Sequence, residues 1–310
     1  MANYEIGNLI RRLRIQKGLK QEELAFPILD QTTLSKIENG RVLPNKKTME
    51  ALFQRLGVNP ANMAAFFLDK KLAKIQQLCD EIDSRLLLQK FDHTDAGIAE
   101  LDALIHALEN SLHADDNSLH RQYLLIAKAC NAVNKRQPTA AIHAYLTEAL
   151  HISLPHFDVA KLDSYYLTRA DVKIINLQSI LYHEEGDYEA AINLRYGLKH
   201  NIEKNCIDTD ELGRSYPNIA YNLANSLYKT KRYSESLAAC DDGIQTSLKT
   251  RALYFLPMMT FLKAINLLNL GETDAGKKLI PQAYYGMKMY GQDDQAKNVQ
   301  VLADDFDIVL

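Results

Sequence analysis

Apolar residues recur along the first sixty positions of the chain at the spacing of short amphipathic helices. Near the amino terminus they stand at positions i, i+3, i+4 and i+7, and the same spacing returns about forty residues later. Between these stretches, Leu34 and Ile37 are one helical turn apart and are expected to face inward with Leu24. The pattern predicts a compact bundle of about four or five short helices. Its other apolar positions are Ile6, Leu9, Ile10, Leu13, Met49, Leu52, Phe53 and Leu56.

The stretch from residue 18 to residue 40 predicts two helices joined by a tight turn, over residues 21–25 and 31–39. Asp30 stands where an N-cap belongs, because its carboxylate can accept hydrogen bonds from the free N–H groups of the following helix. Gly40 stands where the second helix stops, since glycine enters the left-handed conformation at little cost. The outward face of the second helix then carries Gln31, Thr32, Thr33 and Lys36.

A polar and basic helix face of this kind suits the major groove of DNA, where glutamine pairs with adenine, lysine with guanine and the threonine methyl with thymine. The loop that follows is rich in basic residues, and such a loop commonly lies along the sugar-phosphate backbone. Asn45 can cap the helix after it. A helical hairpin with a solvated polar face would give the same local pattern and stays an alternative. The predicted DNA contacts are Gln21, Gln31, Thr32, Thr33, Lys36, Arg41, Lys46 and Lys47.

The distribution of charge favours DNA binding by the amino-terminal part. Residues 1–67 hold ten basic and six acidic residues, a net charge of +4. The whole chain carries −3, so the remainder carries −7. A basic head on an acidic body is typical of a nucleic-acid reader joined to a regulatory domain.

From about residue 70 the chain repeats a pattern of helix hairpins. The stretches 176–192 and 221–237 are alike, and the corresponding aliphatic positions Ile98, Ile142, Ile192 and Leu237 follow at intervals of 44, 50 and 45. Small residues stand where the first helix of each hairpin must let its partner approach. They are Ala129, Ser179, Ala224 and Ala264. The period exceeds the tetratricopeptide length of about 34 residues, so lengthened helices are predicted. An unrelated bundle of amphipathic helices is the alternative.

The fold class predicted is all-α, in three parts. Residues 1–60 form the helix-turn-helix bundle, residues 61–75 a linker helix with Met63, Phe66 and Phe67 on its apolar face, and residues 76–310 a right-handed solenoid of about five hairpins. The tail, residues 296–310, is expected to cap the solenoid or to form a dimer contact.

The inner face of such a solenoid suits an extended peptide. Asparagine side chains can satisfy the N–H and C=O groups of a peptide backbone, because each amide both donates and accepts. Asn176 and Asn222 occupy nearly the same place in adjacent hairpins, although asparagines on a solvated helix surface would look the same. The predicted peptide contacts are Asn176, Ile180, His183, Asn222, Asn225 and Tyr228.

Composition excludes several classes of protein. No apolar run reaches eighteen residues, so no membrane span is expected, and no signal-peptide core is present. The 4 cysteines form no Cys-x-x-Cys motif, and the histidines show no metal-ligand spacing. No phosphate loop or nucleophile elbow occurs. We therefore expect a cytoplasmic protein that is not an enzyme and needs no cofactor or metal.

Two motifs carry a resemblance to known families. Over about residues 5–60, the segments "QEELA" and "LSKIENG" with the Pro44 that follows are similar to the Cro/repressor (Xre-type) helix-turn-helix domain. The stretch between Leu24 and Glu38 is one residue shorter than in the phage repressors and contains Pro27. This shortening, together with the long repeats, resembles the Rgg/PlcR/PrgX-type peptide-pheromone regulators, most closely the PlcR-like members.

The resemblance implies a homodimer that binds double-stranded DNA and a reimported short signalling peptide. It also implies that positions matching Asn176 and Asn222 hold the peptide backbone, and that the peptide changes how the two DNA-binding heads are disposed. We therefore expect a quorum-sensing transcription regulator. One alternative is an Xre-type repressor whose repeats only dimerise or dock a protein partner. Another is a protein-interaction scaffold that has lost DNA binding, or an anti-activator that acts on a signalling protein.

Overall fold

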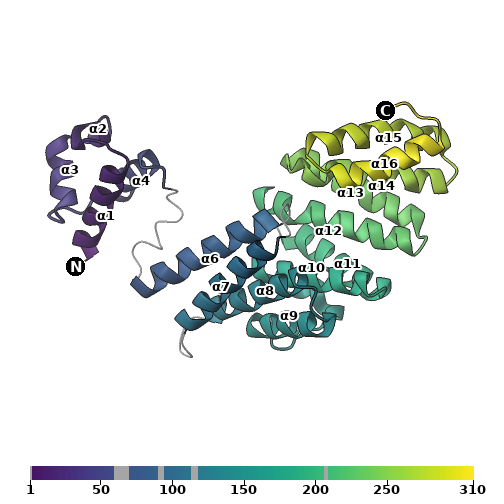
Figure 1. Cartoon of the computed structure of the whole chain (residues 1–310), viewed down its shortest axis with the longest axis horizontal. Coiled ribbons are helices and arrows are strands. Elements are labelled where there is room, and N and C mark those ends of the chain that lie inside the picture. The colour runs from purple at the N-terminus through teal and green to yellow at the C-terminus, as the bar shows by residue number, and fades with distance from the viewer. Residues whose placement is uncertain (1, 59–69, 90–93, 113–117, 206–208) are drawn as a thin grey trace. The chain divides into compact units, whose positions relative to one another are not determined.

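The computed structural model describes residues 2–58, 70–89, 94–112, 118–205 and 209–310. These residues form helices and connecting turns without a strand, so the predicted all-α class is confirmed. The chain divides into two compact units, Met1–Ala114 and Asp115–Leu310. Figure 1 shows the helices of both units, coloured from the amino to the carboxyl terminus.

The first part of the amino-terminal unit is the predicted helix-turn-helix bundle. Its helices are α1 (Ala2–Gln16), α2 (Gln21–Ala25), α3 (Gln31–Glu38) and α4 (Lys46–Arg55). The predicted apolar positions meet in one core, in which Ile10, Leu24 and Leu34 are fully buried. Gly7 lets α1 approach α3, because a Cβ atom there would collide with the Ile37 carbonyl oxygen.

The same unit continues with the helix pair α6 (Lys70–Gln89) and α7 (Asp95–Ser111). Thr94 caps α7 by accepting a hydrogen bond from the Gly97 N–H at 3.2 Å. The two helices pack against each other and bury Ile75 and Ile82 from one side and Leu101 from the other. Most of the predicted linker helix, residues 61–69 with Met63, Phe66 and Phe67, lies outside the described residues.

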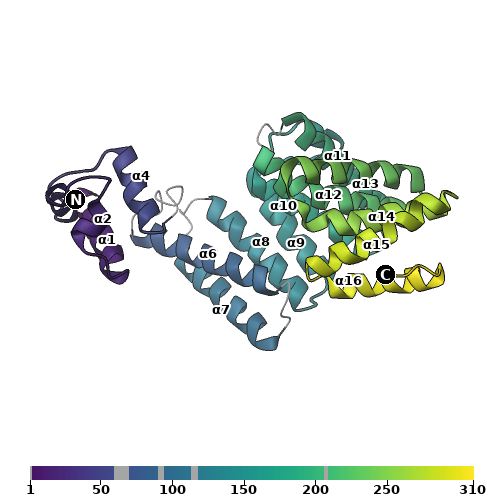
Figure 2. The same cartoon turned by 90° about the horizontal axis from the view of Figure 1, so that it is seen from above.

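The carboxyl-terminal unit is a stack of helix pairs (Figures 1 and 2). Its described residues hold four pairs. The pair α6–α7 of the amino-terminal unit brings the number in the described part of the chain to the predicted five. The first helix of each pair from α8 to α14 also contacts the first helix of the next pair, so these first helices form a continuous layer. The helices are α8 (Ser118–Asn134), α9 (Thr139–Ser153), α10 (Arg169–Glu184), α11 (Tyr188–Asn205), α12 (Thr209–Lys229), α13 (Tyr233–Thr250), α14 (Leu256–Asn269), α15 (Thr273–Met289) and α16 (Asp293–Asp305).

Each first helix of this unit is followed, two positions after its last residue, by a residue with positive φ. These residues are Arg136, Gly186, Lys231 and Gly271, with φ from 52° to 85°. Each comes seven positions after one of the predicted small residues, Ala129, Ser179, Ala224 and Ala264. All four small residues are buried. The small-residue prediction is therefore confirmed, and it provides a common register for the four pairs.

The longest interval between repeats has a structural cause. The connection between α9 and α10 forms the 3-10 helix η2 (Val159–Ser164), which folds back onto α11. The Asn201 amide donates hydrogen bonds to the carbonyl oxygens of Leu162 and Tyr165, at 2.9 and 2.7 Å. Gly197 leaves room for the Leu162 side chain. The extra residues thus form a connection that packs across α11, the second helix of the pair.

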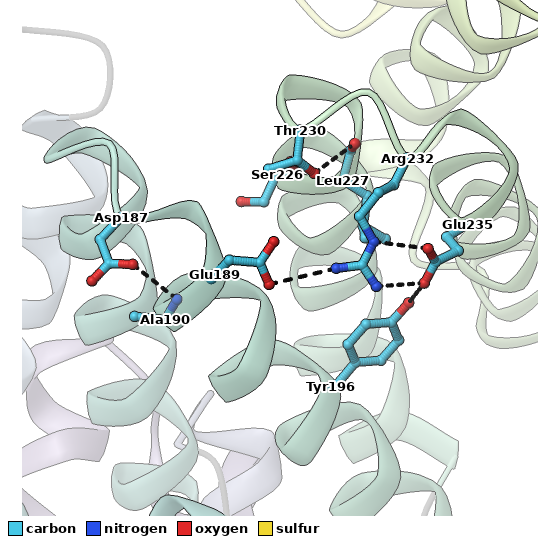
Figure 3. Close-up of polar contacts among 9 residues, drawn as sticks. All are labelled: Asp187, Glu189, Ala190, Tyr196, Ser226, Leu227, Thr230, Arg232 and Glu235. Carbon is cyan, nitrogen blue, oxygen red and sulfur yellow. Dashed lines mark hydrogen bonds and ion pairs between the residues drawn. The ribbon is translucent and has the colours of Figure 1, made fainter.

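Consecutive pairs are also joined through their second helices (Figure 3). The Arg232 guanidinium donates two hydrogen bonds to the Glu235 carboxylate, at 2.7 and 2.6 Å, and lies 3.6 Å from the Glu189 carboxylate of α11. The Tyr196 hydroxyl, also on α11, donates to Glu235 at 3.1 Å. Residues of α11, the α12–α13 turn and α13 therefore share one polar network.

Candidate DNA and peptide interfaces

Helix α3 presents the predicted base-reading face. Gln31, Thr32 and Lys36 are exposed, whereas Thr33 is half-buried. The Thr33 hydroxyl donates to Asp30 Oδ2 at 2.6 Å and its N–H donates to Asp30 Oδ1 at 2.8 Å. These hydrogen bonds lower the pKa of Asp30 and confirm it as the N-cap of α3. Thr33 thus takes part in the cap, and the other three side chains are free to meet base edges.

Gln21 has a partner within the protein. Its amide donates to Glu38 Oε2 at 2.8 Å. The Arg14 guanidinium donates to both oxygens of the same carboxylate, at 2.6 and 2.9 Å, and these bonds raise the pKa of Arg14. Glu38 is only 1% exposed, so the three side chains tie α1, α2 and α3 together. Sequence reasoning missed Arg14 and Glu38, because nothing in their local spacing shows that they meet.

The predicted phosphate contacts lie before and at the start of α4. Arg41 and Lys47 are exposed, and Lys46 is the first residue of α4, with a side chain outside the described set. The Asn45 side chain accepts a hydrogen bond from the Thr48 N–H at 2.9 Å. It therefore caps α4 as predicted.

The predicted peptide contacts lie on the first helices α10 and α12, and we call these six residues the peptide face. All six are half-buried: Asn176, Ile180, His183, Asn222, Asn225 and Tyr228. The Asn176 Oδ1 atom is buried and has no hydrogen-bond partner among the described residues. The Asn222 amide donates to Asn218 Oδ1 at 2.6 Å. A buried amide oxygen without a partner is an acceptor available to the N–H group of a ligand.

The two asparagines are offset by one residue in the common register. Asn176 precedes Gly186 by ten positions, and Asn222 precedes Lys231 by nine. The residue in register with Asn176 is Tyr221 on α12. It is half-buried, and its ring lies 5.8 Å from that of Phe255. The amides are therefore near-equivalent in position and differ in their neighbours.

Beneath the peptide face lies Arg195 of α11, which sequence reasoning missed. Its guanidinium is 1% exposed and donates to Ser179 on α10 and to the Asn222 carbonyl on α12. It also donates to the Ser226 hydroxyl, which lies 2.6 Å from His183 Nδ1. Burial lowers the pKa of Arg195 to about 10. Burial also lowers the pKa of His183, aided by the positive charges of Arg195 and Lys229.

Helix α14 carries three partly buried apolar residues that pack against the core clusters of this unit. Phe261, Ile265 and Leu268 follow one another at i, i+4 and i+7 and are all half-buried. In the described part of the chain, no helix has the length and apolarity needed to span a bilayer. Nor do the described His, Cys, Asp and Glu side chains form a group of three suited to a metal ion.

Comparison with known proteins identifies the amino-terminal part. Residues 10–62 match the model of the helix-turn-helix family. A stretch of 62 residues is 42% identical to the ImmF control region 10 kDa protein of Bacillus phage phi105, covering 19% of this chain and 69% of that protein. This agrees with the helix-turn-helix bundle that the sequence predicts.

Over nearly its whole length, the chain resembles solved structures of two proteins. One is Bacillus thuringiensis PlcR in complex with the peptide PapR7 and DNA, at a TM-score of 0.62 and 20% identity over 96% of this chain and 99% of that chain. Another is ComR from S. thermophilus in complex with DNA and its signalling peptide ComS. Its TM-score is 0.53, and it is 16% identical over 97% of this chain and 99% of that chain. At these identities the likeness establishes a shared fold, which confirms the expected architecture.

Proposed function

Because the chain belongs to the helix-turn-helix family and is thereby a DNA-binding transcription regulator, we propose that a short signalling peptide controls it. In this proposal a cytoplasmic homodimer binds a near-palindromic operator, and the peptide lies on the peptide face. The peptide favours one disposition of the two heads, since a ligand can shift an equilibrium only by its difference in affinity for the two states.

The observation that carries the proposal is the buried Oδ1 atom of Asn176, which no donor of the described residues reaches. A buried acceptor without a partner costs free energy, which an incoming N–H group recovers. Two half-buried amides on adjacent first helices can engage successive units of an extended backbone. The fold shared with the peptide-bound and DNA-bound PlcR and ComR structures supports the same function.

The test is titration calorimetry of the full chain with short peptides encoded beside its gene, with operator binding measured in parallel. We expect Asn176→Ala and Asn222→Ala to weaken peptide binding by about 1–3 kcal/mol each, or about tenfold to a hundredfold. Asn134→Ala, a half-buried asparagine at the end of α8, is the matched control. Unchanged affinity in both variants would remove the asparagines from the site. No binding by any such peptide would favour a repressor whose repeats serve only for dimerisation or docking.

A further inference from the structure

Arg195 is a buried cation without a counter-ion in the described part of the chain. No described carboxylate lies within 4.0 Å of it. Its Nε donates to Ser179 Oγ at 3.0 Å, Nη2 to the Ser179 carbonyl at 2.9 Å, and Nη1 to the Asn222 carbonyl at 2.9 Å and to Ser226 Oγ. All of these acceptors are neutral. The hydrogen-bonding capacity of the guanidinium is therefore largely used, but its charge is not compensated.

The Ser226 hydroxyl connects Arg195 to His183 of the peptide face. The Ser226 hydroxyl accepts from Arg195 and lies 2.6 Å from His183 Nδ1. Since the pKa of His183 is lowered, its imidazole is neutral near pH 7. The hydroxyl can then donate its single proton to Nδ1, which assigns the imidazole proton to Nε2. His183 thus keeps one N–H donor for a ligand, on a ring polarised by the buried guanidinium.

The other charge acting on His183 is positive as well, since Lys229 on α12 also lowers its pKa. A neutral carbonyl could accept from His183 Nε2 but would leave Arg195 uncompensated. A carboxylate would accept the same hydrogen bond and also supply the missing negative charge. This attraction acts partly through the protein interior, where it is screened less than in water.

We propose that the signalling peptide carries a carboxylate, from an acidic side chain or from its own carboxyl terminus, which accepts a hydrogen bond from His183 with Arg195 as buried counter-charge. The inference rests on the proposed peptide-binding function and adds a chemical requirement for the ligand. It makes Arg195 a positioning residue, because it acts through Ser226 and His183.

The probe is a set of synthetic heptapeptide pools. In each pool one position is fixed as Asp or as Asn, the others are randomised, and every pool is made as the carboxyl-terminal acid and as the amide. Retention on the full chain is measured by affinity selection and mass spectrometry. We expect one Asp pool, or the acid form, to be retained about tenfold more than its neutral match, because hydrogen bonds to charged groups are the stronger ones. Comparison of Asp pools with Asn pools tests for a side-chain carboxylate, and comparison of acid pools with amide pools tests for the terminal one.

Substitutions of His183 and Arg195 test whether these two residues cause the preference for a carboxylate. His183→Leu, which removes the N–H donor, and Arg195→Met should each bring the retention ratio close to one, whereas His200→Leu, the same change at an exposed histidine of α11, should preserve it. Thermal unfolding checks that the variants fold, and if Arg195→Met does not, His183→Leu decides.

Retained pools without a carboxylate preference would overturn this inference and leave the proposed function standing. A preference that survives His183→Leu would overturn it equally. Failure of the wild-type chain to retain any pool would overturn the proposed peptide function and this inference together.

Discussion

At the scale of single residues, the hydrogen-bond partner decides what a polar side chain can do. Gln21 and Gln31 are both helix-starting glutamines on the polar side of the helix-turn-helix. Gln31 is exposed, whereas Gln21 donates its amide to the buried Glu38. Gln21 therefore supports the position of α3, and Gln31 remains available to read a base.

The Arg14–Glu38 pair should stabilise the amino-terminal bundle strongly. We expect Glu38→Ala to lower the free energy of unfolding of this bundle by about 3 kcal/mol, because it leaves the Arg14 guanidinium, 11% exposed, without its counter-charge. Denaturant unfolding of the full chain, followed by a probe in the bundle, measures this. Glu22→Ala at an exposed glutamate of α2 is the control and should change stability by less than about 0.5 kcal/mol. Equal effects of the two changes would contradict the assignment.

His183 should make stability depend on pH. Its pKa in the folded chain lies below the ordinary value of 6.5, owing to burial and then to Arg195 and Lys229. Between the two pKa values the unfolded chain binds more protons at this side chain. The free energy of unfolding therefore falls as the pH falls through this window, and the contribution of His183 is fully present above it.

The measurement is Tm between about pH 5 and about pH 8, the range in which histidine titrates. His183→Gln should reduce the loss of Tm as the pH falls, and His200→Gln should not. A slope that is the same in wild type and His183→Gln would show that this imidazole is not held neutral.

At the scale of elements, α3 and the start of α4 are predicted to make different kinds of contact with DNA. Gln31→Ala should cost about 1–3 kcal/mol on the cognate operator and relax the base preference, since it removes a contact to a base edge. Lys47→Ala should weaken all sequences alike and flatten the salt dependence, since it removes a phosphate contact. Binding to operators obtained by selection from random DNA, at several salt concentrations, distinguishes the two. If both changes weakened cognate and random DNA equally, α3 would not be the recognition helix.

The first and second helices of each pair require a small residue where they meet. Ala224 is fully buried, and its carbonyl accepts a hydrogen bond from Ser236 of α13 at 2.7 Å. Ala224→Leu should therefore cost about 1–3 kcal/mol through overpacking. Ala238→Leu, at an exposed position of α13, is the matched control. Denaturant midpoints measure both, and a tolerated Ala224→Leu would contradict the register assigned to the repeats.

At the scale of the whole molecule, the net charge is distributed unevenly along the chain. The +4 charge lies in residues 1–67, and the rest of the chain carries −7. The basic part contains the helix-turn-helix, and the acidic part contains the peptide face. A basic amino-terminal segment and an acidic remainder are consistent with one part that binds DNA and another that responds to a ligand and pairs the heads.

Separating the parts should lower DNA affinity without abolishing it. Residues 1–67 alone should bind the operator about a hundredfold or more weakly than the full chain, because two linked heads engage two half-sites together. Half-sites are expected about one helical turn, roughly 34 Å, apart or at a multiple of it. Gel-shift titration compares affinities, and sedimentation of the full chain tests for the dimer. A strictly monomeric full chain at micromolar concentration would contradict this arrangement.

Features that depend on neighbouring residues in the chain could be predicted from the sequence. The caps Asp30 and Asn45, the positive φ of Gly40 and the four small positions of the repeats all agree with the structure. Each follows from helical period, cap chemistry or the conformational freedom of glycine. These rules act over a few residues, so one sequence suffices to apply them.

Only the tertiary structure decided which distant polar groups meet. Arg195 reaches Ser226, 31 positions along the chain, and Arg14 reaches Glu38, 24 positions away. Neither arginine differs in the sequence from a solvated surface residue. Whether a charge is enclosed depends on the packing of several helices at once, which no local period encodes. For that reason the sequence determined the helices and their order, while the buried cation beneath the peptide face emerged only from the packed fold.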